Sequence, residues 1–223
     1  NPLRKFPPDL IYKNKMWCCF PHWFLIDCCK TYDEVDKEHP VKPYPHLPHL
    51  IEFCRQWETY PLLCTVKSRR LLVTWMCTAL EVWECITRQY TATYVVGREQ
   101  TSSEKFLGRH VFILENLNPE FIARPRVKVK RGSSGYPERI TFLDNGSRIE
   151  AVSSEPNKIR SEGATRIRCE EIAFWQWPED SWKAILPAIQ GGGRIVVVST
   201  PLAGSWFEQL VKDQLAQPVT GSS

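Results

Sequence analysis

The pattern of hydrophobic and polar positions along the chain predicts a series of alternating strands and helices. Residues 61–66 form a short apolar run typical of a buried strand, and residues 73–90 carry apolar side chains at helical intervals. The same alternation recurs in strands at 93–96, 165–169 and 194–199 and in helices at 102–117, 178–190 and 206–215. The turn signal Asp144-Asn145-Gly146 adds a hairpin between 139–142 and 148–152. Because several strands are apolar on both faces, the pattern predicts an α/β fold with a mostly parallel central sheet flanked by helices on both faces.

The first part of the chain follows a different pattern. Residues 1–48 are rich in proline, aromatic and charged residues and show no sustained period. They predict an N-terminal appendage with one short helix over 17–31, followed by an extended segment over 40–45, because proline disfavours helix for itself and its predecessor. Helical spacing begins at 47–57. The predicted organisation is therefore an appendage at 1–48 and a core domain at 49–223.

Composition and charge exclude few classes of protein. Hydrophobic residues make up 43% of the chain and charged residues 24%, which is ordinary for a globular protein. No apolar run approaches the roughly 18–20 residues that cross a bilayer, so no membrane partner is expected. The net charge of +4 is a mild bias. Basic clusters at 67–70 and 124–131 are typical of a solvated face, with DNA contact as the alternative.

The nine cysteines permit two interpretations. One is a zinc site, whose ligands would be Cys18, Cys19, His22, Cys28 and Cys29. Structural zinc sites usually use cysteines separated by two to four residues, whereas these cysteines form adjacent pairs. The odd count and the positions within apolar segments favour reduced, buried thiols in a cytosolic protein.

Candidate chemistry begins at the end of the first predicted core strand. Residues 67–74 connect a strand to a helix, as phosphate-binding loops do, and Thr74 in the first helical turn fits the hydroxyl that binds Mg²⁺. The usual pattern G-x-x-x-x-G-K-[ST] is broken, because Leu72 stands at the second glycine and Val73 at the lysine. Lys67 stands at the first glycine and could reach inward. Taken alone, this segment is better explained as a basic strand-to-helix turn.

Two further strand ends carry polar groups. Glu170 and Glu171 follow the strand at 165–169, and alternation would direct one carboxylate to a metal and the other to an attacking water. Ser199 and Thr200 end the strand at 194–199, where hydroxyls can sense a γ-phosphate or merely cap the strand. Ligands of such sheets bind at the carboxyl ends of the strands, and the ordered combination of all three segments predicts an ATPase.

These segments resemble the large terminase family of phages and prophages. Residues 67–75 resemble its Lys-Ser-Arg-Arg-x(3)-[Ser/Thr]-Trp loop, and residues 170–174 its Asp-Glu-x-Ala-Phe segment. Ser199-Thr200-Pro201 resembles its coupling motif, residues 159–165 its Leu-Arg-Gly-x-Thr segment, and residues 40–45 the lead-in to its adenine pocket. The resemblance implies a P-loop ATPase of the additional-strand, catalytic-glutamate type.

The resemblance also implies roles for single residues. Glu171 would be the catalytic base, and Arg160 the arginine finger, with Arg98 and Arg109 as reserve candidates and an ordinary ion pair of Arg160 as the alternative. Thr74 and Glu170 would hold Mg²⁺. Ser199 and Thr200 would couple hydrolysis to movement. The residues implied to bind ATP are Lys67, Ser68, Arg69, Arg70, Leu71, Leu72, Val73, Thr74 and Tyr44.

The implied function is that of the motor domain of a DNA-packaging enzyme in the cytoplasm of an infected bacterial host. ATP hydrolysis with Mg²⁺ would move double-stranded DNA into a procapsid, with Lys128, Lys130 and Arg131 as candidate DNA contacts. Implied partners are further copies in a ring, the small terminase subunit and the portal protein; the family's nuclease half has no counterpart in residues 1–223. The alternatives are a catalytically inert or weak module for DNA docking or assembly, favoured by the missing glycines, and a helicase-like remodelling ATPase.

Overall fold

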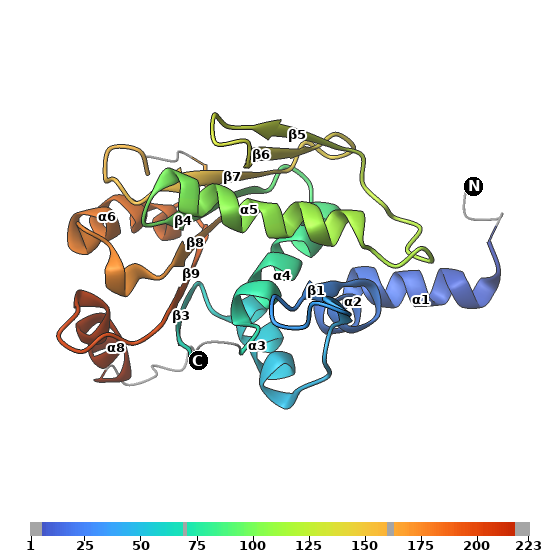
Figure 1. The fold of residues 1–223 in the computed structure, drawn as a ribbon, viewed down its shortest axis with the longest axis horizontal. Coiled ribbons are helices and arrows are strands. Elements are labelled where there is room, and N and C mark those ends of the chain that lie inside the picture. Colours follow the sequence, from blue (N-terminus) through green and yellow to red (C-terminus); the bar gives the residue numbers. More distant parts are fainter. Residues whose placement is uncertain (1–5, 69–70, 160–162, 217–223) are drawn as a thin grey trace.

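A seven-stranded sheet forms the centre of the protein in a computed structural model that describes residues 6–68, 71–159 and 163–216 (Figure 1). Its strand order is β3-β9-β8-β4-β7-β6-β5, in which the first five strands pair in parallel and β6 pairs antiparallel with both β7 and β5. The strands are β3 (Leu62–Val66), β4 (Ala92–Gly97), β5 (Val127–Arg131), β6 (Pro137–Phe142), β7 (Arg148–Ser153), β8 (Arg166–Glu170) and β9 (Arg194–Ser199). The mostly parallel sheet and the hairpin of β6 and β7 are confirmed.

Helices cover both faces of this sheet, as the apolar strands predict. Alternate residues of β9 show the two sides: Val196 and Val198 pack with helices α3 and α4, whereas Ile195 and Val197 pack with α6 and α8. On the first side lie α3 (Pro48–Thr59), α4 (Val73–Thr87) and α5 (Gln100–Glu115), and α6 (Pro178–Ile185), α7 (Pro187–Gln190) and α8 (Trp206–Ala216) belong to the second. Within the described part of the chain, no helix is long and apolar enough to span a membrane.

Two predicted helices are each divided in two. The helix expected over 17–31 is wrong, because α1 (Pro8–Cys19) and α2 (Pro21–Cys28) meet at an extended Phe20 with φ −126°. The residue that precedes a proline is pushed out of the helical region, so Pro21 starts a new helix. The helix expected over 178–190 is divided at Leu186, which keeps a helical backbone with φ −50° and ψ −38°. The following Pro187 has no N–H to continue the hydrogen bonds of the first helix.

The N-terminal segment packs into the main core. After α2 the strands β1 (Lys30–Tyr32) and β2 (Val41–Pro43) pair antiparallel, which confirms the extended segment over 40–45. Trp17, Phe24 and Leu25 share one hydrophobic cluster with residues of α3 and α4. Residues before and after position 48 therefore contribute to one core, and a domain boundary at that position remains a prediction.

All nine cysteines are free thiols. Cys28 and Cys29 are buried in the core, whereas Cys18 is half-buried and Cys19 is exposed. Consecutive residues of a helix point about 100° apart, so adjacent cysteines cannot easily face one ion together. Among the described residues, which include the whole of the candidate zinc set, no three His, Cys, Asp or Glu side chains are grouped to hold a metal ion. The zinc interpretation therefore has no support.

Candidate active site

The three chemically suggestive segments meet at one edge of the sheet. Strands β3, β9 and β8 are neighbours and run parallel, with Val66 opposite Ser199 and Glu170 opposite Val198. Parallel strands present their carboxyl ends at the same edge. Strand β9 thus lies between the strand of the basic loop and the strand of the acidic pair, which agrees with the additional-strand type of fold that the resemblance implies.

Glu171 is held by three donors from the two neighbouring strand ends. Lys67 Nζ donates to Glu171 Oε1 at 2.8 Å, the backbone N–H of Thr200 donates to Oε2 at 2.9 Å, and the Thr200 hydroxyl donates to Oε1 at 3.2 Å. A left-handed backbone, with φ 55°, turns Glu171 out of β8. Burial raises the pKa of this carboxyl, but the donors outweigh it, and the pKa lies below its usual value. The structure thus brings the candidate base, the loop lysine and the coupling threonine together.

Glu170 lies beside Thr74 in a dry environment. The Thr74 hydroxyl donates to Glu170 Oε2 at 3.3 Å, and Arg168 donates to Oε1 at 2.9 Å. Glu170 is 1% exposed, and burial raises the pKa of its carboxyl, against the opposing charges of Arg168, Lys67 and Arg109. Mg²⁺ prefers hard oxygen ligands and usually takes only one or two from the protein when it binds with a nucleotide. The hydroxyl and carboxylate side by side therefore fit the predicted magnesium site.

The loop between β3 and α4 uses a left-handed residue without glycine. Leu72 precedes α4 with φ 59° and ψ 6°, a conformation that favours glycine. Its position is the second glycine of the usual phosphate loop, so Leu72 holds there a backbone conformation that glycine adopts without strain. Ser68 and Leu71 are exposed and Val73 is buried, whereas Arg69 and Arg70 lie outside the described residues.

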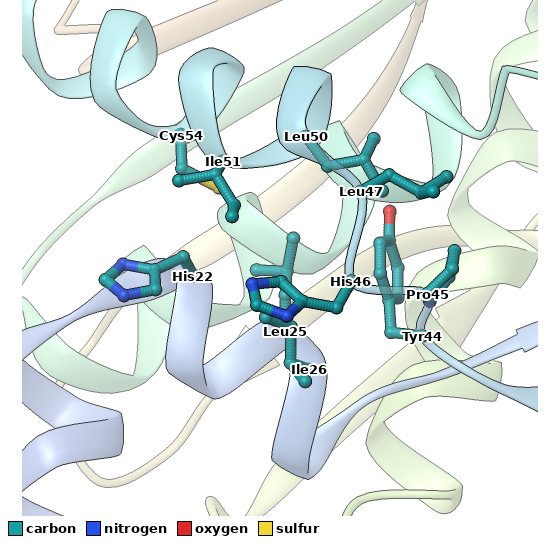
Figure 2. Close-up of a pocket in the computed structure, with 10 residues that line it drawn as sticks. All are labelled: His22, Leu25, Ile26, Tyr44, Pro45, His46, Leu47, Leu50, Ile51 and Cys54. Atoms are coloured by element: carbon teal, nitrogen blue, oxygen red, sulfur yellow. The ribbon is translucent and has the colours of Figure 1, made fainter.

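Tyr44 belongs to the core beside this loop. It is 4% exposed, and its hydroxyl donates to the Leu72 carbonyl at 3.4 Å. Its ring stands at one end of a small pocket between α2 and α3, with His22 at the other end (Figure 2). The pocket is lined by His22, Leu25, Ile26, Tyr44, Pro45, His46, Leu47, Leu50, Ile51 and Cys54. Tyr44 contacts the candidate nucleotide loop directly, and a contact with ATP remains a prediction.

The candidate arginine fingers lie in different environments. Arg160 is outside the described residues. Arg98 follows β4, is more than half exposed and pairs with Glu99 at 3.2 Å. Arg109 on α5 is half-buried, with its guanidinium 5.6 Å from the ring centre of Trp75. Burial lowers the pKa of Arg109, opposed chiefly by the charge of Glu170. Arg98 is the more accessible of the two.

The candidate DNA contacts occupy the edge strand β5. Lys128 and Lys130 are exposed, but Lys130 pairs with Glu138 at 2.9 Å and Arg131 donates to the carbonyl of Gly135 at 3.0 Å. Lysines on an edge strand also prevent unwanted strand pairing. The charge available to DNA on this strand is therefore smaller than the sequence suggests.

Arg168 received no role from the sequence alone, although it contacts the candidate metal ligands. It lies in the middle of buried strand β8 and is 0% exposed. The available signal was an arginine at alternate positions of an apolar strand, which is unusual because buried charges need partners. The partners lie on a distant segment, helix α4, at Thr78 and Glu81.

No protein-family model matches the chain. Among solved structures, the large terminase of bacteriophage HK97 is 13% identical, with a TM-score of 0.66 over 91% of this chain and 41% of that one. The ATPase domain of the large terminase of Thermus phage P74-26 is 17% identical, with a TM-score of 0.57 over 74% and 69% of the chains. The large terminase of another thermophilic bacteriophage is 15% identical, with a TM-score of 0.58 over 77% and 42%.

The chain therefore spans about two fifths of the HK97 protein and of the last of these terminases, and about two thirds of the P74-26 domain. At such low sequence identities, the structural similarity shows a shared fold only. The parallel sheet, the inserted strand β9 and the meeting of three strand ends agree with it. The chain has the fold of the ATPase domains of phage large terminases.

Proposed function

We propose that this chain is the ATP-hydrolysing motor domain of a phage-type large terminase. The observation that carries the proposal is the meeting of Lys67, Glu171 and Thr200 at the ends of three adjacent strands, next to the pair of Thr74 and Glu170. An ATPase needs a cation for phosphate, a hydroxyl and a carboxylate for the metal, and a base for water, and these residues supply all four.

Each residue would act through the contacts it already makes. The phosphates of ATP would compete with Glu171 for Lys67 Nζ, which would release the carboxylate to orient and deprotonate a water. Thr200 would keep Glu171 in place through its N–H and hydroxyl. Thr74 and Glu170 would hold Mg²⁺, which when bound offsets the charge on the transferring phosphoryl oxygens. Thr200 directly follows β9, so a movement of Thr200 on release of phosphate would be transmitted to that strand.

The wider role is part of the same proposal. Copies of the chain would form a ring, with the arginine of a neighbour completing each site, and would move double-stranded DNA through non-specific phosphate contacts in the cytoplasm of the infected host. The small terminase subunit and the portal protein are its proposed partners. A second candidate is an inert or weak docking module. The absence of glycine from the loop favours it, as does the engagement of Glu171 by Lys67.

Release of phosphate from ATP with Mg²⁺ tests the proposal, together with equilibrium binding of a fluorescent ATP analogue. We expect Glu171→Gln to bind ATP while losing turnover by roughly 10²–10⁴-fold, the usual contribution of a general base. Lys67→Ala should lose both binding and turnover. Glu179→Gln, at an exposed carboxylate of α6, is the matched control and should change neither.

The outcomes separate the two candidates. A wild-type chain that neither binds nor hydrolyses ATP, with or without double-stranded DNA, would leave the docking module as the better explanation. Binding without turnover would indicate that the chain lacks a residue supplied by a neighbour. Turnover that survives Glu171→Gln would refute the assignment of the base.

A further inference from the structure

Two arginines of strand β8 point to helix α4, and they differ in what they touch. Arg166 and Arg168 are two residues apart, so they lie on the same face of the strand. Both are buried, with exposed fractions of 2% and 0%. Removing a charged side chain from water costs several kcal/mol, and each arginine is paired with a glutamate of α4. The two side chains therefore have matched surroundings and can be compared directly.

Arg166 makes a bidentate pair away from the candidate metal ligands. Its Nε and Nη2 donate to the two carboxylate oxygens of Glu84 at 2.8 and 2.7 Å, and its guanidinium lies 3.8 Å from the ring centre of Trp57. Both partners belong to the helical layer above the sheet. Neither of these contacts reaches the candidate metal ligands, so the role of Arg166 is to join β8 to the helices.

Arg168 contacts both candidate metal ligands. Its Nη1 donates to Glu170 Oε1 at 2.9 Å and to the backbone carbonyl of Thr74 at 3.2 Å, with Thr78 Oγ1 at 3.3 Å. The Thr78 hydroxyl itself donates to the same Thr74 carbonyl at 2.8 Å. One guanidinium nitrogen thus bridges the carboxylate at the end of β8 and the first turn of α4. With Oε1 engaged by Arg168, Glu170 Oε2 is the oxygen that meets the Thr74 hydroxyl.

The other side of Arg168 is fixed by a second layer of buried groups. Arg168 Nε lies 3.0 Å from Glu81 Oε1, and His110 Nε2 lies 2.7 Å from Glu81 Oε2. Arg168, Glu81 and His110 are all 0% exposed and come from β8, α4 and α5. Among the described residues, however, Arg168 Nε, Arg168 Nη2 and Glu81 Oε1 have no hydrogen-bond partner despite that distance. Among these residues Arg166 Nη1 is also without a partner, so the two arginines differ in what they contact and not in how completely they are satisfied.

We propose that Arg168 is the positioning residue of the metal site, which holds the Glu170 carboxylate and the Thr74 turn in register for Mg²⁺. This inference rests on the proposed function, since it assumes that Thr74 and Glu170 bind the metal. Groups that orient metal ligands from behind typically change metal affinity 10–100-fold when they are replaced. Arg168 would act in this way without touching substrate.

The test compares Arg168→Lys with Arg166→Lys. Each variant keeps the positive charge and removes the planar guanidinium group, so each loses the ability to donate to several acceptors at once. Binding of mant-ATP is measured as a function of Mg²⁺ concentration, alongside thermal unfolding, which reports stability independently. We expect Arg168→Lys to raise the half-saturating Mg²⁺ concentration by roughly 10-fold or more. Arg166→Lys should lower the unfolding temperature and leave that concentration within twofold of wild type.

A milder pair keeps the test decisive if the lysine variants do not fold. Glu81→Gln loosens Arg168 from behind, and Glu84→Gln does the same to Arg166. We expect Glu81→Gln alone to raise the half-saturating Mg²⁺ concentration, by less than Arg168→Lys does. If the two variants of each pair change the half-saturating Mg²⁺ concentration equally, the positioning role is overturned while the proposed function stays intact. Wild-type protein that shows no Mg²⁺-dependent nucleotide binding would instead overturn the proposed function, and this inference with it.

Discussion

The backbone strain at Leu72 predicts that glycine is more stable than alanine at this position, which is the reverse of their order inside a helix. Leu72 precedes α4 with φ 59° and ψ 6°, and the left-handed conformation costs a residue with a Cβ roughly 1–2 kcal/mol. Leu72→Gly removes that cost and also removes the side chain. Leu72→Ala removes most of the same side chain and keeps the Cβ. The difference in stability between these two variants therefore isolates the backbone strain.

The magnitude follows from two opposing contributions. Glycine removes roughly 1–2 kcal/mol of strain, and its greater freedom in the unfolded chain costs about 0.5–1 kcal/mol relative to alanine. We expect Leu72→Gly to be more stable than Leu72→Ala by roughly 0.5–1 kcal/mol. For a domain of this size, such a difference corresponds to about 1–4 °C in unfolding temperature.

Urea unfolding followed by tryptophan fluorescence measures the difference, since the chain has nine tryptophans. A second pair of variants at Gln209, an exposed position within α8, supplies the control. There glycine should be less stable than alanine by about 1 kcal/mol, because the position is helical. If Leu72→Ala is as stable as Leu72→Gly or more so, the loop does not hold a left-handed residue at this position, and the reasoning fails.

Three further predictions concern charge and thiol chemistry. The backbone N–H and side chain of Arg126 hold the pKa of Asp144 below its usual 3.8, so the stability difference between wild type and Asp144→Asn should be constant above about pH 5 and shrink as the pH falls further. If the proposed DNA contact is right, Lys128→Ala should reduce the salt slope of DNA binding by about 0.9, whereas Lys130→Ala should change it less because a carboxylate already pairs with Lys130. A thiol reagent at pH 8 should label exposed Cys19 first, and serine at that position should abolish the fast phase.

The sequence was sufficient to predict the strands at whose ends the candidate site residues lie. Lys67, Glu171 and Thr200 each follow an apolar strand, and parallel strands bring such positions to one edge whatever their distance along the chain. The strands themselves could be predicted because an apolar run bounded by polar turns is compatible with few other structures. These patterns do not predict which strands are neighbours in the sheet, and the structure shows that order.

Tertiary contacts decided the features that the sequence did not reveal. Glu81 and Glu84 lie about one turn apart on α4, a rise of roughly 4.5 Å, which approaches the spacing of about 6.6 Å between Arg166 and Arg168 on β8. Two rows of opposite charge can therefore pair across the layers, as they do here. Either row alone resembles an ordinary solvated charge. The left-handed conformation of Leu72 could not be predicted from the sequence for a related reason. The surroundings set this loop conformation, and without a glycine the sequence carries no signal of it.

Burial gives the two adjacent glutamates different environments. The Glu171 pair is partly exposed, with side-chain fractions of 11% for Lys67 and 32% for Glu171, and water keeps the net energy of such a pair near about 1 kcal/mol. A triphosphate carries more charge than the carboxylate and can take over the lysine at modest cost. The Glu170 pair is closed to water, with 0% for Arg168 and 1% for Glu170, and leaving such a charge without its partner costs roughly 3–5 kcal/mol. Under the proposed function, Glu170 would therefore stay where Arg168 holds it, and Glu171 would be the carboxylate that exchanges partners when a nucleotide binds.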